Sequence, residues 1–300
     1  MSPEEMDTLL RRLPVLEQLL THLAREATAT RQTLEKQHLD RERLIRVEQE
    51  TYYEHLLESS RYREPKRLHR YERQVFSQHG EDGIIEEIFH RIGASGRTFI
   101  EIGVEDGKEN NTAHLVQQGW QGVWVDADQQ ALMRAAQEFA KPIGESRLKI
   151  LAAMVTAENI ARILSENNAP REPDLMSLDI DRNTYYLWKA LAGFKARLVV
   201  IEYNATMGPS QSWKVEYAAN KLWNRTSYFG ASLKAYEELG RELGYRLVGC
   251  ETSGANAFFV REDLAGDHFA EPFTSENHYE PPRYFLDRCA GHPRGFGDGA

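Results

Sequence analysis

Two short polar stretches hold the side chains that are best suited to chemistry. The stretch SLDIDRN places Asp179 and Asp181 two residues apart, directly after a short apolar run. The stretch VVIEYN places Glu202 and Asn204 two residues apart at the end of a second apolar run. Hard oxygen ligands of this kind suit Mg²⁺, Mn²⁺ or Ca²⁺. A carboxylate can also orient or deprotonate a hydroxyl group.

The elements around these acids predict a doubly wound α/β sheet. Between residues 97 and 260, short apolar runs alternate with helical segments, which indicates a parallel sheet with helices on both faces. The last two runs, YRLVGCE and ANAFFVRE, are separated only by TSG, so they must form an antiparallel hairpin. A sheet that finishes in this way is typical of Rossmann-like class I methyltransferases. Ligands bind at the carboxyl ends of such strands, where the four polar residues should meet.

The turn after the first strand predicts the cofactor. In EIGVEDGKENNT, Gly103 and Gly107 permit a tight turn, and a helix beginning near Asn111 would offer its N–H groups. Glu101 and the two acids inside the turn would repel a pyrophosphate, whereas S-adenosylmethionine has no phosphate and carries cationic amino and sulfonium groups. Asp126, at the end of the second strand, is placed to accept both ribose hydroxyls. The alternative is an acidic loop that binds no ligand.

Five segments resemble the FkbM-like class I methyltransferases, which are often found with bacterial glycan and secondary-metabolite enzymes. They are SQHGEDGIIEEIF, FIEIGVEDGKENNTAHLVQQGW, VWVDAD, SLDIDRNTYYLWKAL and VVIEYN. The resemblance implies S-adenosylmethionine binding at Glu101, Gly103 and Asp126. The general methyltransferase turn reads acid-x-G-x-G-x-G, and Glu105 stands in place of its middle glycine.

The segment SQHGED before the first strand resembles the part of the family that closes over the methionine end of the cofactor. This similarity makes Ser77, Gln78 and Asp82 candidate cofactor residues. The alternative for Asp82 is an N-cap or first-turn acid of the following helix.

The stretch LDIDRNTYY also resembles the D-A-D-K-x-N-Y segment of the metal-dependent caffeoyl-CoA and catechol O-methyltransferases. The resemblance implies a metal on Asp179, with Glu202 and Asn204 in place of an Asp-Asn pair on the next strand. Arg182 replaces the lysine and cannot act as a base, because its pKa lies above ~12. A bound metal would then have to acidify the acceptor hydroxyl itself. Two alternatives stay open: a metal-free site in which Asp179 or Asp181 acts on the acceptor, and Asp181 as a helix cap.

Residues 1–62 predict a helical coiled-coil region. The chain has no glycine from Pro14 to about residue 60, and Pro14 suits the first turn of a helix. An a/d stripe with steps of three and four occupies positions 13, 16, 20, 23, 27, 30 and 34. We predict that this region joins two or more copies of the chain. The alternative is a long helix that folds back on its own domain.

The remaining boundaries follow from composition. A basic segment at 63–76 predicts a solvated linker, with an anionic surface as the alternative partner. The methyltransferase domain then occupies 77–265, and 266–300 forms a C-terminal tail that could complete the substrate pocket. The aromatic-rich segment 203–232 suits a sugar or polyketide substrate, whereas packing of a lid is the competing interpretation.

Charge and cysteine content narrow the possible partners. The first 70 residues are neutral, so all nine excess negative charges lie in the remainder, which argues against nucleic acid as a partner. No apolar run approaches the ~20 residues of a transmembrane segment, and the N-terminus lacks the layout of a signal peptide. Cys250 and Cys289 form neither a disulfide framework nor a zinc signature. We therefore predict a cytoplasmic protein.

These observations together predict an S-adenosylmethionine-dependent O-methyltransferase. Its acceptor would be a hydroxyl of a sugar, a glycan or a small molecule, with Mg²⁺ or Mn²⁺ as the candidate activating metal. The main alternative is a non-catalytic methyltransferase-fold scaffold that is oligomerised by its coiled coil. A dehydrogenase is the third hypothesis.

Overall fold

The computed structural model describes residues 2–286 and residue 295. Its contacts divide the chain into two compact units, Met1–His55 and Leu56–Ala300. Cys289 and the last part of the predicted tail lie outside the described residues.

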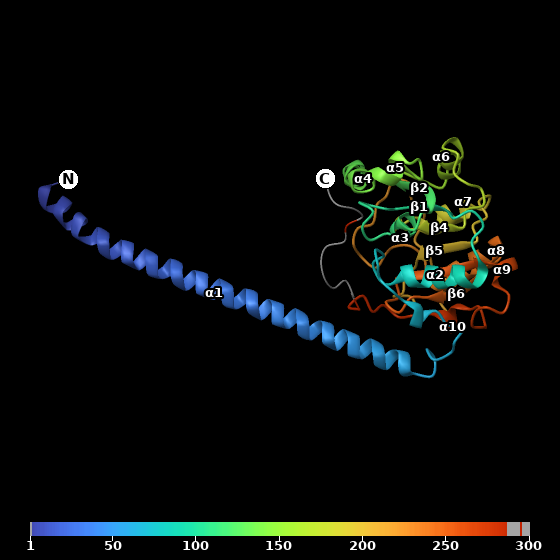
Figure 1. Ribbon diagram of the computed structural model, residues 1–300, viewed down its shortest axis with the longest axis horizontal. Helices are drawn as coiled ribbons and strands as arrows, with labels where there is room; N and C mark the ends of the chain where they lie inside the picture. Colours follow the sequence, from blue (N-terminus) through green and yellow to red (C-terminus); the bar gives the residue numbers. More distant parts are fainter. Residues whose placement is uncertain (1, 287–294, 296–300) are drawn as a thin grey trace. The chain divides into compact units, whose positions relative to one another are not determined.

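The described residues form seven strands and a series of helices (Figure 1). The strands are β1 (Thr98–Ile102), β2 (Gln121–Asp126), β3 (Leu148–Ala152), β4 (Leu175–Leu178), β5 (Leu198–Glu202), β6 (Tyr245–Cys250) and β7 (Asn256–Arg261). The helices are α1 (Pro3–Glu58), α2 (Glu81–Ile92), α3 (Ala113–Gln117), α4 (Gln129–Glu138), α5 (Ala140–Gly144), α6 (Ile160–Glu166), α7 (Thr184–Ala190), α8 (Leu233–Leu243), α9 (Glu262–Ala265) and α10 (Ser275–His278), with a 3₁₀ turn η1 (His69–Tyr71).

The strands make one mixed sheet in the order β3-β2-β1-β4-β5-β7-β6. The pairs from β3 through to β5 are parallel, whereas β7 is antiparallel to both of its neighbours. The predicted hairpin is thus confirmed, and the strand order is that of the class I methyltransferase fold. The order reverses between β1 and β4, which is where ligands of doubly wound sheets bind.

Helices cover both faces of the sheet because the strand residues alternate between two apolar clusters. Ile100 and Ile102 of β1 pack in one cluster with Trp188 of α7. Phe99 packs in the other cluster with Ile84 of α2. The helices α6, α7 and α8 contribute to the first cluster, and α2, α3 and α4 contribute to the second. This three-layer arrangement leaves the carboxyl edge of the sheet to the loops.

The long helix α1 runs from Pro3 to Glu58, as the glycine-free segment predicts. It begins eleven residues earlier than expected, so Pro14 lies inside the helix and not in its first turn. Among the described residues, no helix has both the length and the apolar character that crossing a membrane requires.

Gly103 fixes the close approach of β1 to the segment after β4. Its N–H donates to the Val125 carbonyl at 2.9 Å, and the Asp179 N–H donates to the Ile102 carbonyl at 2.9 Å. Gly103 has φ +85°, and a Cβ atom there would lie 1.5 Å from the Asp179 carbonyl oxygen. Only glycine fits this position, and the predicted tight turn is confirmed.

The substitution Gly103→Ala is therefore expected to destabilise the fold strongly. Gly119→Ala is the matched control, because Gly119 has φ +88° but open space where a Cβ would stand. We expect a loss of about 1–2 kcal/mol for the control from backbone strain alone. Overpacking of ~1–3 kcal/mol or more adds to this loss at Gly103. Chemical denaturation of both variants measures the difference, and equal losses would contradict the steric argument.

Candidate functional site

Three carboxylates gather at the carboxyl ends of β4 and β5. Asp179, Asp181 and Glu202 each offer one oxygen, and these oxygens all lie within 4.8 Å of one another. Surrounding protein raises the pKa of Asp179 to about 6, with a further contribution from the negative charge of Asp181. Burial, followed by the charges of Asp179 and Asp181, raises the pKa of Glu202 well above its ordinary value. Asp179 is nevertheless open to solvent.

This cluster can bind a cation. Like charges at such distances cannot all ionise without compensation, so they either share protons or hold a positive ion. Three carboxylate ligands from two adjacent strand ends suit a hard divalent metal.

Asp181 belongs to this cluster and does not cap the following helix. The helix α7 begins at Thr184, its N-cap residue is Asn183, and no side chain caps its first N–H groups. Asp181 has φ +59°, a left-handed conformation that is uncommon for a residue other than glycine. Strained backbone of this kind is often found at functional sites. The capping hypothesis for Asp181 is therefore wrong.

Asn204 holds the following loop and is not available to a metal. Its side chain is fully buried. Its amide N–H₂ donates to the carbonyls of Ser227 (2.8 Å) and Phe229 (3.0 Å), and its amide oxygen accepts from Thr206. All of its ordinary hydrogen-bonding capacity is used. The expectation that Asn204 would share a metal with Glu202 is thus contradicted.

Glu101 organises the loop after β1. Its buried carboxylate accepts hydrogen bonds from the Asn110 side chain (2.8 Å), the Asn111 backbone (2.8 Å) and the Thr112 backbone and hydroxyl. Burial raises the pKa of Glu101 to about 7, although these hydrogen bonds oppose the rise. The helix α3 begins at Ala113, and the N–H groups of Asn111 and Thr112 go to Glu101. The prediction that the N–H groups near Asn111 face a ligand is wrong for these two residues.

Asp126 organises the same loop from the end of β2. One carboxylate oxygen accepts from the Val104 and Glu105 N–H groups at 2.9 Å, and the other accepts from the Asp128 N–H at 2.8 Å. A carboxylate offers about four acceptor positions, so one remains for a ligand hydroxyl.

Gly107 serves packing. A Cβ atom there would lie 2.8 Å from the Trp124 ring. Its φ of +78° also favours glycine, so this residue is explained without a cofactor contact. The prediction that Gly107 allows backbone to approach a cofactor is not needed to explain it.

The segment before α2 is tied together by Asp82. One Asp82 oxygen accepts from the N–H groups of Val75, Phe76 and Ser77 at 2.7–2.8 Å and from the Ser77 hydroxyl at 2.9 Å. Gln78 is exposed beside it. Asp82 lies in the first turn of α2, and the N-cap is Gly80. The interpretation of Asp82 as a first-turn acid of α2 is thus sound, but these contacts involve only one of its two carboxylate oxygens.

Two buried oxygens in these loops lack a protein partner. Among the described residues, the Asp82 Oδ1 and Asn110 Oδ1 atoms are buried without a hydrogen bond. Buried acceptors of this kind are rare and indicate a missing donor. Asn110 escaped the sequence analysis because it sits in an acidic turn with no distinguishing motif.

The sequence analysis also did not single out Tyr236 as a candidate site residue. Its side chain on α8 is fully buried, and its hydroxyl has no hydrogen bond within the described residues. Burial, followed by the charges of Glu202 and Asp179, raises its pKa well above the ordinary value. The sequence pattern of α8 marks Tyr236 only as a core position.

The loop 203–232 packs on the start of α7 and also exposes aromatic surface. The Tyr186 hydroxyl donates to the Val215 carbonyl at 2.8 Å, and Arg182 donates to the Glu216 carbonyl at 3.2 Å. Trp223 and Tyr228 stay exposed. Both predicted roles of this segment are therefore compatible with its structure.

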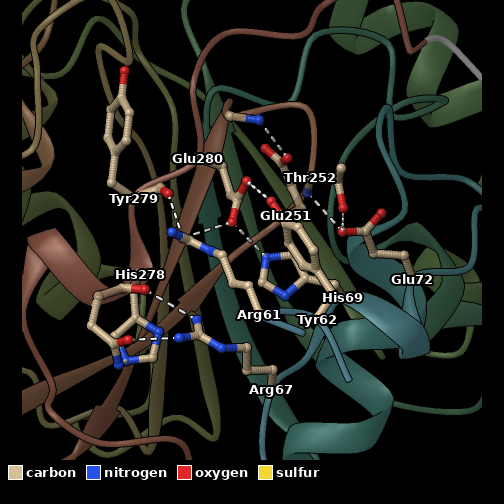
Figure 2. A network of polar contacts seen from close by, with 12 residues as sticks. Arg61, Tyr62, Arg67, His69, Glu72, Glu251, Thr252, His278, Tyr279 and Glu280 are labelled. Carbon is tan, nitrogen blue, oxygen red and sulfur yellow. Dashed lines mark hydrogen bonds and ion pairs between the residues drawn. The ribbon is translucent and has the colours of Figure 1, made fainter. Parts of the chain in front are cut away.

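The basic segment before α2 is part of the folded unit. Glu280 is fully buried and accepts from Arg61 (3.0 Å), Tyr62 (2.6 Å), His69 (3.0 Å) and Arg283 (2.8 Å), as Figure 2 shows for the first three. Burial opposes ionisation, but the hydrogen bond from His69, together with Arg61 and Arg283, lowers the pKa of Glu280 to about 2. Burial in turn lowers the pKa of His69, so we assign it as a neutral donor. The prediction of a solvated linker is wrong here.

Two further contacts join the tail to the residues that follow β5. The Tyr203 hydroxyl, next to Glu202, donates to the Glu280 carbonyl at 2.6 Å. The Tyr279 hydroxyl donates to the Ala205 carbonyl at 2.6 Å. The tail segment after α10 thus runs along the carboxyl end of β5, where it can line the site.

No family model matches the sequence, and no curated protein matches it. Solved structures with similarity include magnesium protoporphyrin IX methyltransferase from Synechocystis PCC 6803 with bound S-adenosylmethionine, at 11% identity over 60% of this chain and 77% of that chain, with a TM-score of 0.39. A putative S-adenosylmethionine-dependent methyltransferase from Listeria monocytogenes is 12% identical over 60% of this chain and 97% of that chain (TM-score 0.40). A putative caffeoyl-CoA O-methyltransferase from Staphylococcus aureus is 13% identical over 59% of this chain and 81% of that chain (TM-score 0.41).

The hydrogen bonds and charges around Glu280 predict that the stability of the fold depends on pH. The Glu280 pKa is about 2 in the folded protein against 4.5 ordinarily, so its stabilising effect is complete above about pH 4.5 and is lost as the pH falls towards 2. Glu280→Gln should therefore lower the unfolding midpoint at pH 7, and the deficit should shrink below pH 4.5.

The control is Glu86→Gln, which breaks the exposed pair between Arg73 and Glu86. Exposed pairs contribute only ~0–1 kcal/mol, so little change is expected at any pH. A Glu280→Gln deficit that is independent of pH would contradict the assigned ionisation.

Proposed function

We propose that this protein is an S-adenosylmethionine-dependent O-methyltransferase that acts on a hydroxyl of a sugar, a glycan or a small molecule. The observation that carries the proposal is the carboxylate cluster of Asp179, Asp181 and Glu202 at the ligand-binding edge of a sheet with methyltransferase strand order. An acidic edge suits a cationic cofactor and disfavours a pyrophosphate, which argues against the dehydrogenase hypothesis.

The loops around β1 fit S-adenosylmethionine. The unpartnered Asp82 Oδ1 and Asn110 Oδ1 atoms would accept from its amino group. The remaining acceptor position of Asp126 would take a ribose hydroxyl. Glu101 would act indirectly by holding the loop, and Ser77 would support Asp82. When bound, the cofactor supplies an electrophilic methyl group.

A divalent metal fits the acidic cluster. Asp179, Asp181 and Glu202 would hold Mg²⁺ or Mn²⁺, which would favour ionisation of the acceptor hydroxyl. The residues of the chain would orient that hydroxyl for in-line attack, with catalysis resting on positioning and on the deprotonated acceptor. The exposed Trp223 and Tyr228 offer flat apolar faces for the acceptor.

Calorimetry tests the cofactor. We expect S-adenosylmethionine to bind, and Asp126→Asn to weaken binding about 10- to 100-fold, because a charged hydrogen bond contributes ~1.5–3 kcal/mol. Asp263→Asn, which alters an exposed pair with Arg261, should bind like the wild type. No binding of S-adenosylmethionine at millimolar concentration would overturn the proposal and favour the scaffold alternative.

Mn²⁺ titration followed by electron paramagnetic resonance tests the metal. Asp179→Asn and Glu202→Gln should lose Mn²⁺ binding. Asp128→Asn should keep it, because Asp128 caps α4 and asparagine caps equally well. Without metal, the first two variants should be more stable than the wild type at pH 8, since each removes charge repulsion. Unchanged Mn²⁺ binding in Asp179→Asn would rule out this metal site.

A further inference from the structure

We infer that α1 pairs with α1 of a second copy of this chain as an antiparallel two-stranded coiled coil centred between residues 21 and 22. The inference goes beyond the proposed activity, because it fixes the partner, the orientation and the register of the N-terminal helix. It rests on the exposed apolar stripe of α1 and on the pattern of sizes and charges along that stripe.

The apolar stripe of α1 lies open to solvent. Leu13, Leu16, Leu20, Leu23 and Leu34 are each 49–65% exposed. Complete burial of one such side chain is worth ~1.5–3 kcal/mol, so a partner helix would gain considerably by covering the stripe. Their spacing of three and four residues assigns them to the a and d positions of a coiled coil. Pro14 falls on an outer b position, where it does not interrupt the stripe.

The sizes of the stripe residues are complementary when a second copy of the helix runs in the opposite direction. When Leu20 lies opposite Leu23 of the second copy, the small residues Ala27 and Thr30 lie opposite Leu16 and Leu13 of that copy. Large side chains then face small ones, which fills the core evenly. A parallel pair in register would instead place Ala27 against Ala27 and Thr30 against Thr30, and such layers leave space unfilled.

The flanking charges are compatible with the same register. A parallel pair in register would also place Arg12 opposite Glu17 and Glu26 opposite Arg31, so the orientation rests on the sizes along the stripe and is tested by the charge swaps below. In an antiparallel pair, g positions face g positions and e positions face e positions. This register places Arg12 opposite Glu26, and Glu17 opposite Arg31, and each pair occurs twice by symmetry. Arg31 also bonds Glu35 of its own helix at 2.8 Å, a contact on the same exposed side. Shifting the register by one heptad either way removes both complementary pairs.

The length of the apolar stripe also fits the antiparallel register. The helix begins at Pro3, so in this register the overlap ends at residue 40 of the partner. The next two a positions after Leu34 are Arg41 and Glu48, which are polar where the partner helix has ended. A parallel pair would bring Arg41 against Arg41. The stripe therefore weakens where antiparallel pairing no longer requires it, although Leu44, at a d position beyond the overlap, is also exposed.

Matched charge swaps test the orientation by sedimentation equilibrium. The double variant Arg12→Glu/Glu26→Arg keeps complementary pairs in the antiparallel dimer but creates repulsion in a parallel one. Arg12→Glu/Glu17→Arg does the opposite, and both variants keep the wild-type net charge. We expect the first to dimerise like the wild type and the second to dimerise about 10- to 100-fold more weakly. The reverse order would overturn the antiparallel assignment.

Spin labels test the register independently. Arg25 and Leu39 both lie on the outer f position, so single cysteines there, with Cys250 and Cys289 replaced, leave the seam intact. At 1.5 Å per residue, the axial offset between identical labels is about 10 Å at position 25 and about 50 Å at position 39. A short distance at both positions would establish a parallel pair, and no dipolar coupling at either would show that the chain does not self-associate.

Discussion

The structure depends on how it accommodates negative charge along one edge of the sheet. Carboxylates end four neighbouring strands, and two of them, Glu101 and Asp126, are compensated by N–H groups of the loops beside them. The carboxylates at the ends of β4 and β5 face one another within 4.8 Å, and the Asp181 N–H donates to Asp179 at 3.4 Å. The first kind shapes the edge, and the second kind is the set to which the proposed function assigns a cation.

Glu280 shows how this chain treats a carboxylate that is purely structural. Two arginines, a tyrosine and a histidine surround it, so its charge is balanced inside the protein and its pKa falls to about 2. Asp179 and Glu202 show the opposite shift, because desolvation and the neighbouring negative charges outweigh the hydrogen bond that Asp179 accepts from the Asp181 N–H. The contrast separates a carboxylate that holds the fold from carboxylates whose charge the fold leaves uncompensated.

Sequence patterns predicted the sheet and the meeting of the acids because both follow from local periodicity and parallel topology. They failed where a side chain depends on a turn or on a distant partner. The capping prediction for Asp181 failed because α7 begins only at Thr184, with Asn183 as its N-cap, while Asp181 sits in the preceding turn with a left-handed backbone. The metal prediction for Asn204 failed because the strand ends at Glu202. The Asn204 amide instead closes a loop by donating to the carbonyl of Phe229, 25 residues later. The sequence predicted a solvated basic segment because Glu280, the buried partner of these basic residues, lies more than 200 residues away along the chain.

The same electrostatics constrain the acceptor. A phosphorylated or otherwise anionic acceptor would be repelled by the cluster at Asp179 unless a metal screened it, whereas a neutral hydroxyl compound would meet no such barrier. The adjacent loop adds Trp223 and Tyr228, whose exposed rings suit the apolar faces of a sugar or a ring system. In the proposed reaction the hydroxyl must also lose a proton, so a neutral acceptor would gain most from the proposed metal. The acid cluster and the aromatic loop thus favour the same class of substrate for different physical reasons.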